Sequence, residues 1–121
     1  MKSDQVKDVA LAALEELKGR HIVALDVRHL TDMTDYMVIA TGTSNRHVAA
    51  LAEQVTDALR QQHDMRPLGT EGEQVSEWVL VDYGDVVVHV MLAETRAFYD
   101  LERLWSDGSM TAPGQQDGGC S

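Results

Sequence analysis

Apolar residues near the start of the chain recur every three or four positions, which is the spacing of one face of an α-helix. The residues in this pattern are Val6, Val9, Ala10, Ala13, Leu14 and Leu17. We predict a helix over residues 3–18, with Ser3 as its N-cap and Gly19 at its end. A second set with the same spacing predicts a helix from residues 42–45 to about residue 62; its apolar members are Val48, Leu51, Ala52, Val55 and Leu59.

The segments between these two helices have the composition of β-strands. Residues 21–27 are rich in Ile, Val and Leu and predict a first strand, which a polar, turn-prone connection follows at 28–35. Residues 36–41 form a continuous apolar run between Asp35 and Gly42. Such a run is typical of a strand that is buried on both faces.

The second half of the chain predicts a hairpin and a last helix. Residues 64–73 form a connection with a short extended piece at 66–68, where Pro67 disfavours helix at the preceding residue. Residues 78–82 and 86–91 predict two strands joined by a tight turn at 83–85, and residues 95–105 predict a third helix. The fold class is therefore α/β, a single domain with a mixed β-sheet packed by helices. We expect this domain to cover residues 1–106 and residues 107–121 to form a disordered tail.

The two faces of the predicted hairpin differ in chemistry. Because strand side chains alternate between faces, five valines lie on one face and predict the core: Val79, Val81, Val86, Val88 and Val90. The other face is mixed and holds Trp78, Leu80, Asp82, Val87, His89 and Met91. Two interpretations stay open for it. Either a helix covers this face and His89 is a hydrogen-bonded core histidine, or Trp78 and Asp82 contact a protein partner, since Trp is enriched at binding hot spots.

The last helix carries a further candidate contact residue. At about 100° per residue, its apolar stripe includes Phe98, Leu101 and Trp105. Tyr99 lies off this stripe, beside Glu102, so its ring is a candidate for the surface. Acidic residues are frequent around these aromatics: Glu71, Glu73, Glu77, Asp82, Asp85, Asp100 and Glu102.

The net charge narrows the classes of partner. The 121 residues carry a formal charge of −10, and the arginines are scattered with no basic run. A phosphate backbone repels such a chain, so direct nucleic-acid binding is disfavoured and a basic protein partner is favoured. No apolar segment has the length of a membrane span or a secretory signal, and the single cysteine, Cys120, cannot form an internal disulfide. We therefore expect a cytoplasmic protein.

Catalytic and metal-binding chemistry finds little support in the sequence. Residues 42–44 (GTS) at a helix start could bind phosphate, but no paired carboxylates follow on a strand to hold metal ions. Thr43 or Ser44 is more simply a helix N-cap. The five histidines are spread over separate elements without metal-ligand spacing, so we predict no metal and no cofactor.

Four blocks of sequence resemble one known family in order and spacing. They are residues 34–48 (TDYMVIATGTSNRHV), 71–72 (EG), 77–90 (EWVLVDYGDVVVHV) and 96–105 (RAFYDLERLW). The family is that of the ribosomal silencing factors (RsfS, Iojap-like), and the likeness covers roughly residues 3–106. It implies a nucleotidyltransferase-like topology without enzymatic activity. Tyr83 departs from the family's pattern, in which this position is often aliphatic.

The resemblance also implies a function. Members of the family bind ribosomal protein fourteen of the large subunit, block the joining of the subunits and so repress translation, and they tend to be homodimers when free. Carried over by motif position, the partner-binding residues would be Trp78, Asp82 and Tyr99, with Tyr83 and Glu102 as weaker candidates. Two alternatives stay open: a nucleotide-binding or nucleotidyl-transferring enzyme, and an acidic adaptor for another basic protein.

Overall fold

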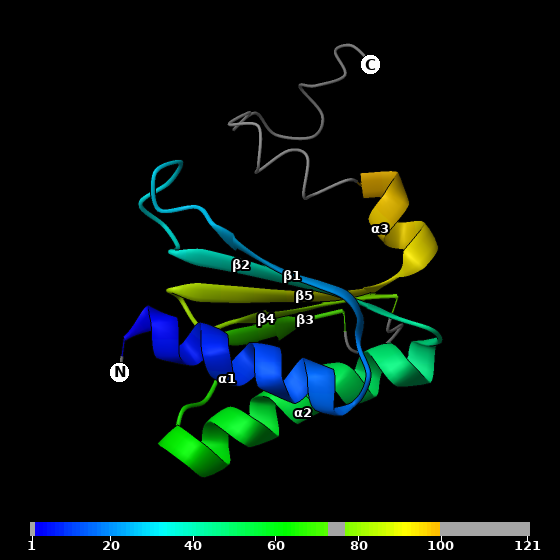
Figure 1. Cartoon of the computed structure of the whole chain (residues 1–121), viewed down its shortest axis with the longest axis horizontal. Coiled ribbons are helices and arrows are strands. Elements are labelled where there is room, and N and C mark those ends of the chain that lie inside the picture. Colours follow the sequence, from blue (N-terminus) through cyan, green and yellow to red (C-terminus); the bar gives the residue numbers. More distant parts are fainter. Residues whose placement is uncertain (1, 73–76, 100–121) are drawn as a thin grey trace.

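In the part of the chain that the structure describes, five strands form one mixed sheet, and three helices pack against it (Figure 1). The computed structural model describes residues 2–72 and 77–99. In chain order the elements are α1 (Ser3–Glu16), β1 (Arg20–Asp26), β2 (Tyr36–Gly42), α2 (Asn45–His63), β3 (Gly69–Glu71), β4 (Trp78–Asp82), β5 (Val86–Leu92) and α3 (Ala93–Tyr99). The strand order across the sheet is β1-β2-β5-β4-β3, with β2 and β5 parallel and the other pairs antiparallel. The predicted single-domain α/β fold is confirmed, while its relation to nucleotidyltransferases stays a prediction.

The main core lies between the sheet and the two long helices. Helices α1 and α2 run side by side across one face of the sheet, and α3 lies on the opposite side (Figure 1). The predicted apolar stripes of both long helices face the sheet; their buried members are Val6, Ala10, Ala13, Leu14, Val48, Leu51, Ala52, Val55 and Leu59. Every residue of β2 is buried, as its continuous apolar run predicts.

Both ends of α1 differ from the prediction. The N-cap is Lys2, and Ser3 is already the first helical residue. The backbone N–H of Lys2 donates to Gln5 Oε1 at 3.1 Å. The helix ends at Glu16 because Lys18 takes the left-handed conformation, with φ 60°. Gly19 then donates its N–H to the carbonyl oxygen of Leu14 at 2.8 Å, so the chain turns one residue earlier than Gly19 alone indicates.

The start of α2 follows the prediction. Ser44 is the N-cap, and its Oγ accepts the N–H of His47 at 3.1 Å. Two other predicted boundaries are shifted. Strand β3 spans residues 69–71 and not 66–68, because Pro67 has no N–H to give to a ladder and pairing with β4 begins only after it. Helix α3 begins at Ala93, two residues before the predicted start, and the rest of the predicted helix, 100–105, lies outside the described residues.

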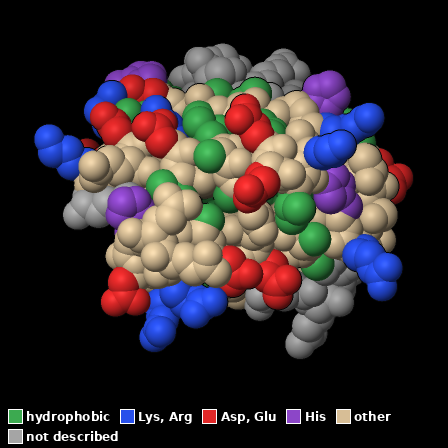
Figure 2. Space-filling model, turned by 60° about the horizontal axis from the view of Figure 1, so that its bottom comes forward, with side chains coloured by type: hydrophobic (Ala, Val, Ile, Leu, Met, Phe, Trp, Pro, Cys, Tyr) green, Lys and Arg blue, Asp and Glu red, His purple; other side chains and the backbone are tan. Residues whose placement is uncertain are grey.

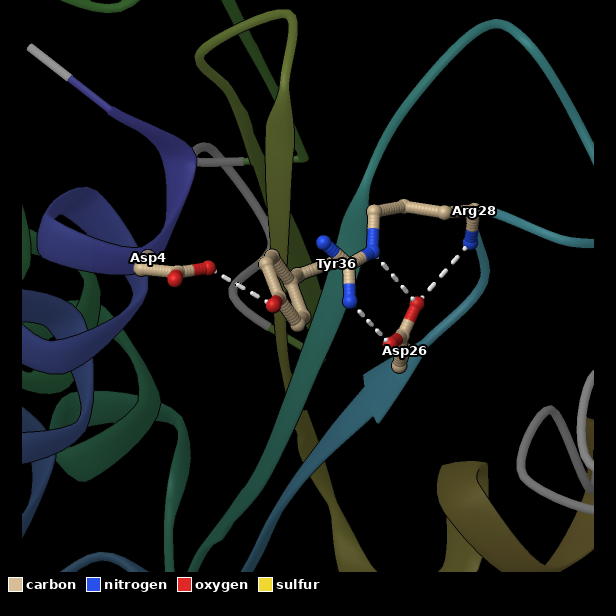
Figure 3. Close-up of polar contacts among 4 residues, drawn as sticks. All are labelled: Asp4, Asp26, Arg28 and Tyr36. Atoms are coloured by element: carbon tan, nitrogen blue, oxygen red, sulfur yellow. Dashed lines mark hydrogen bonds and ion pairs between the residues drawn. The ribbon is translucent and has the colours of Figure 1, made fainter.

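A polar cluster ties α1 to the sheet at the start of β2. The hydroxyl of the buried residue Tyr36 donates to Asp4 Oδ1 at 2.7 Å, and this bond raises the pKa of the Tyr36 hydroxyl (Figure 3). The cations of Lys7 and Arg28 lie 4.7 and 5.2 Å from the centre of its ring. Arg28 is held in turn by the carboxylate of Asp26, with contacts of 3.0 and 2.6 Å. The guanidinium holds the pKa of Asp26 at about 2.

The hairpin turn between β4 and β5 is bound to the β1–β2 connection. The carbonyl oxygen of Asp85 accepts the backbone N–H groups of Asp35 and Tyr36, at 2.8 and 3.1 Å, and the hydroxyl of Thr34 at 2.9 Å. Gly84 at the tip has φ +85°, a conformation that glycine adopts without strain. This end of the hairpin, which places Asp82, is therefore fixed by tertiary hydrogen bonds.

Candidate protein-binding surface

The predicted division of the hairpin into two faces is confirmed. Val79 pairs with Val90 and Val81 with Val88, and all four are fully buried beneath α1 and α2. The pairs Trp78–Met91, Leu80–His89 and Asp82–Val87 lie on the opposite side. We call this side the Trp78 face; it consists of Trp78, Leu80 and Asp82 of β4 and Val87, His89 and Met91 of β5.

The Trp78 face is buried unevenly. His89 and Met91 are buried, and Met91 packs in a second, smaller apolar cluster with Val27, Met37 and Ile39. The β4 residues Trp78, Leu80 and Asp82 are only half-buried. The face is thus packed at His89 and Met91, while Val87 and the three β4 residues, which include the candidate contacts, are only half-buried.

Trp78 is held by a hydrogen bond to the histidine of the neighbouring strand. The indole Nε1–H donates to His89 Nδ1 at 2.9 Å. The two ring centres are 5.8 Å apart, and the ring planes are tilted by 45°. Burial lowers the pKa of His89 to about 4, because desolvation disfavours its charged form. The imidazole is therefore neutral near pH 7 and can accept the indole proton.

Carboxylates border the exposed part of this face. Asp82, at the other end of β4, lies four residues from Trp78, a distance of about 13 Å along a strand. Its Oδ1 accepts the N–H of Gly84 at 2.7 Å, which also shapes the turn. Glu71 of β3 is exposed and pairs with Leu80, so it lies on the same face. The predicted combination of an aromatic side chain and acidic neighbours is thus present along β4.

The other predicted contact residues are placed differently. Tyr83 is only 7% exposed and packs in the core beneath α1 and α2, on the face opposite to Trp78. Its burial raises the pKa of its hydroxyl to about 12. We correct the expectation for Tyr83 accordingly: it is a core residue. Tyr99 is the last residue of α3, but its side chain, like all of Glu102, lies outside the described residues.

Helix α3 is attached to the sheet through a residue that sequence reasoning missed. Arg96 Nη1 donates to Thr41 Oγ1 at 2.8 Å. Thr41 pairs with Met91, so its side chain lies on the Trp78 face, at the end where α3 begins. Neither residue belongs to an apolar period, and a contact across 55 positions leaves no local signal in the sequence. Arg96 thus holds the helix that carries Tyr99 on the same side of the sheet as Trp78.

Two backbone N–H groups at the possible phosphate site at the start of α2, those of Thr43 and His47, already donate to side chains of the protein. A cleft of about 400 Å³ lies there, lined by residues that include Arg20, His21, Thr43 and Glu94. The N–H of Thr43, however, donates to His47 Nδ1 at 2.9 Å, and the Nε2 of the same ring contacts the Leu17 carbonyl at 2.8 Å. Within residues 2–72 and 77–99, no group of three or more His, Cys, Asp and Glu side chains could hold a metal ion. In the same part of the chain, no helix has the length and apolar character needed to span a bilayer.

Comparison with known proteins agrees with the resemblance seen in the motifs. A sequence model of the family described as "Ribosomal silencing factor during starvation" matches residues 1–118. The chain belongs to the ribosomal silencing factor family. A relative from Chromobacterium violaceum, named ribosomal silencing factor RsfS, is 47% identical over 105 residues, which are 87% of this chain and 85% of that protein. The predicted RsfS and Iojap likeness is therefore confirmed.

A solved structure and an organellar protein are also similar to this chain. A crystal structure of a C. violaceum protein superposes with a TM-score of 0.85 at 46% identity and covers 88% of both chains. The chloroplastic protein Iojap of Zea mays is 35% identical over 102 residues, and the match spans 44% of its length. Ribosomal silencing factors are not a known class of enzymes.

Proposed function

We propose that this protein binds the large ribosomal subunit through ribosomal protein fourteen and sterically prevents the small subunit from joining. One observation carries the proposal beyond family membership: the half-buried Trp78 lies on the same face of the sheet as the carboxylates of Asp82 and Glu71. In this proposal the protein acts in the cytoplasm, forms a homodimer when free, and needs no cofactor or catalytic step.

Aromatic and acidic residues have separate tasks in this contact. Trp78 supplies a large rigid surface, and truncating such a hot-spot side chain typically costs about 2 kcal/mol or more. Tyr99, and Glu102 by motif position, would extend the contact from α3. The carboxylates of Glu71 and Asp82 on the same face, with the net charge of −10, favour approach to a basic protein surface and repel ribosomal RNA. Affinity and orientation are therefore set by different groups.

Repression follows from occupancy alone. A domain bound where the small subunit docks excludes that subunit without any conformational change. At a free concentration about ten times the dissociation constant, roughly nine-tenths of the large subunits carry the protein. The fraction of joined ribosomes should therefore fall with the free concentration of the protein, along the same curve as its binding.

The binding step can be tested by sedimentation. We expect the protein to comigrate with large but not small subunits in a sucrose gradient. Trp78→Ala and Tyr99→Ala should fold normally and bind at least roughly thirty-fold more weakly. Met33→Ala is the matched control, because Met33 is an apolar side chain that is 86% exposed outside the Trp78 face. Comigration of both aromatic variants at the level of the parent would refute the proposed surface.

The blocking step needs its own measurement. Light scattering can follow the joining of purified subunits as the protein is added. We expect joining to decrease in parallel with binding, and both effects to weaken as salt screens the carboxylates. Normal joining in the presence of excess bound protein would show that docking does not block the small subunit and would leave an acidic adaptor as the better description.

A further inference from the structure

Trp78 and His89 form a diagonal pair across β4 and β5. Trp78 faces Met91 and His89 faces Leu80, so the two rings are offset by two residues along the ladder. Diagonal neighbours in an antiparallel pair are within reach of each other when the side chains are long or aromatic. The 2.9 Å bond from the indole Nε1 to His89 Nδ1 spans this diagonal.

The two members of the pair are restrained to different degrees. His89 lies on β5, which has strands on both sides in the sheet, and it is only 6% exposed. Trp78 is the first residue of β4 and is only half-buried. The closely packed histidine therefore provides a fixed point to which the more accessible indole is attached.

The hydrogen bond also decides which chemistry Trp78 offers to a partner. An indole has a single N–H donor and no acceptor. Because that donor is directed at His89 within the domain, a partner meets the carbon surface of the ring. Recognition by Trp78 is then apolar contact in a defined orientation.

We propose that His89 is a positioning residue that holds the Trp78 indole in its partner-binding orientation by accepting its Nε1–H. The inference rests on the proposed function, since it concerns the same surface. An indole that is already ordered loses less conformational freedom on binding than one that is free to rotate. His89 thus contributes to affinity without touching the partner.

Substitutions at His89 separate its hydrogen bond from its packing. His89→Leu keeps a buried side chain of similar size but has no acceptor. His89→Asn places an amide oxygen close to the position of Nδ1. We expect His89→Leu to bind large subunits roughly three- to ten-fold more weakly, the effect of freeing one aromatic side chain, and His89→Asn to recover most of that loss. In a Trp78→Ala background, His89→Leu should cause no further loss.

Nitrogen NMR of the full-length protein provides a readout that needs no substitution at His89. We expect the neutral His89 ring to carry its proton on Nε2, with Nδ1 as the acceptor of the Trp78 indole N–H. Loss of one indole N–H resonance in Trp78→Phe assigns that signal and separates it from the signal of Trp105. The opposite tautomer, with the proton on Nδ1, would overturn the inference even if every His89 variant failed to fold.

The outcomes distinguish this inference from the proposed function. If Trp78→Ala weakens binding but His89→Leu binds like the parent, the positioning role is refuted and the contact surface stands. If His89→Leu weakens binding equally with and without Trp78, His89 acts through general packing, and the inference again fails. If Trp78→Ala binds like the parent, the contact surface itself is wrong.

Discussion

Arg96 in α3 donates a hydrogen bond of 2.8 Å to the hydroxyl of Thr41 at the end of β2. Thr41 is only 3% exposed, and its side chain lies on the Trp78 face. The bond therefore joins the helix that carries Tyr99 to the sheet that carries Trp78. We infer that the relative position of the two predicted aromatic contacts depends on this junction.

Replacing the hydroxyl of Thr41 tests the junction. Thr41→Val retains the shape of the side chain but removes the acceptor, and hydrogen bonds to charged groups contribute about 1.5–3 kcal/mol. We expect the free energy of unfolding in urea to fall by about that amount and binding to large subunits to weaken. Thr56→Val is the matched control, since the Thr56 hydroxyl donates to the Glu53 carbonyl within the same helix. Equal effects of the two variants would contradict a specific role of the junction.

Gly72 and Gly84 offer a paired test of the backbone around β4. Both have positive φ, +84° and +85°, so a side chain at either position is strained. The two positions differ in the room that they leave for a side chain. A Cβ at Gly72 would overlap the carbonyl oxygen of Trp78, whereas a Cβ at Gly84 would have Leu68 Cδ1 as its nearest neighbour, at 3.3 Å.

The comparison predicts unequal losses of stability. Gly84→Ala should lower the free energy of unfolding by about 1–2 kcal/mol, the cost of a left-handed residue. Gly72→Ala should lower it by more, because the backbone at Trp78 must also move. Urea denaturation and large-subunit binding of both variants provide the measurement. If Gly84→Ala proves as costly as Gly72→Ala, the close approach to Trp78 is not what requires glycine at position 72.

The fold could be predicted from periodicity because burial imposes it directly. The stripes of α1 and α2 and the all-valine face of the hairpin repeat with the period of their element, and all three pack in the core, where Val9 and Leu17 of α1 are only partly buried. Boundaries were less accurate because capping depends on backbone geometry: Lys18, a residue that no pattern marks, takes the left-handed position at the end of α1.

The candidate surface was only partly predictable. Strand alternation places Trp78 and His89 on one face of the sheet. Their hydrogen bond also depends on the orientation of the two rings, which the period of the sequence does not specify. For Tyr83 the signal was present, because positions 79, 81 and 83 share the same parity and the first two are core valines. The predicted turn at residues 83–85 begins one residue too early, because Tyr83 continues the buried face of β4.

The buried position of Tyr83 predicts how the variant Tyr83→Phe should behave. The Tyr83 hydroxyl is buried and has no hydrogen-bond partner among residues 2–72 and 77–99. A buried polar group without a partner lowers stability, so its removal should leave the free energy of unfolding unchanged or raise it by up to about 1–3 kcal/mol. Binding to large subunits should not change, since the residue lies beneath the helices. A clear loss of binding in a stable Tyr83→Phe variant would return this residue to the contact surface.

The buried imidazole of His89 makes stability depend on pH in a defined window. Its pKa is about 4 in the folded protein, against 6.5 for a free histidine. Well above pH 6.5 neither the folded nor the unfolded state is protonated, and His89 causes no pH dependence. As the pH falls below 6.5, the unfolded state binds a proton that the folded state excludes, so the free energy of unfolding decreases until the pH reaches about 4. The loss due to this residue should be about 2 kcal/mol at pH 5 and about 3 kcal/mol at pH 4.

Urea denaturation between pH 7.5 and pH 5 measures this loss, with His89→Asn as a control that keeps an acceptor but cannot titrate. The stability of the parent should decrease with acid by about 2 kcal/mol more than that of the variant. In the folded protein Nδ1 is protonated only near pH 4, so between pH 7.5 and pH 5 binding to large subunits should change no more in the parent than in His89→Asn. If the free energy of unfolding falls equally with pH in the two proteins, His89 is more accessible to water than the structure indicates.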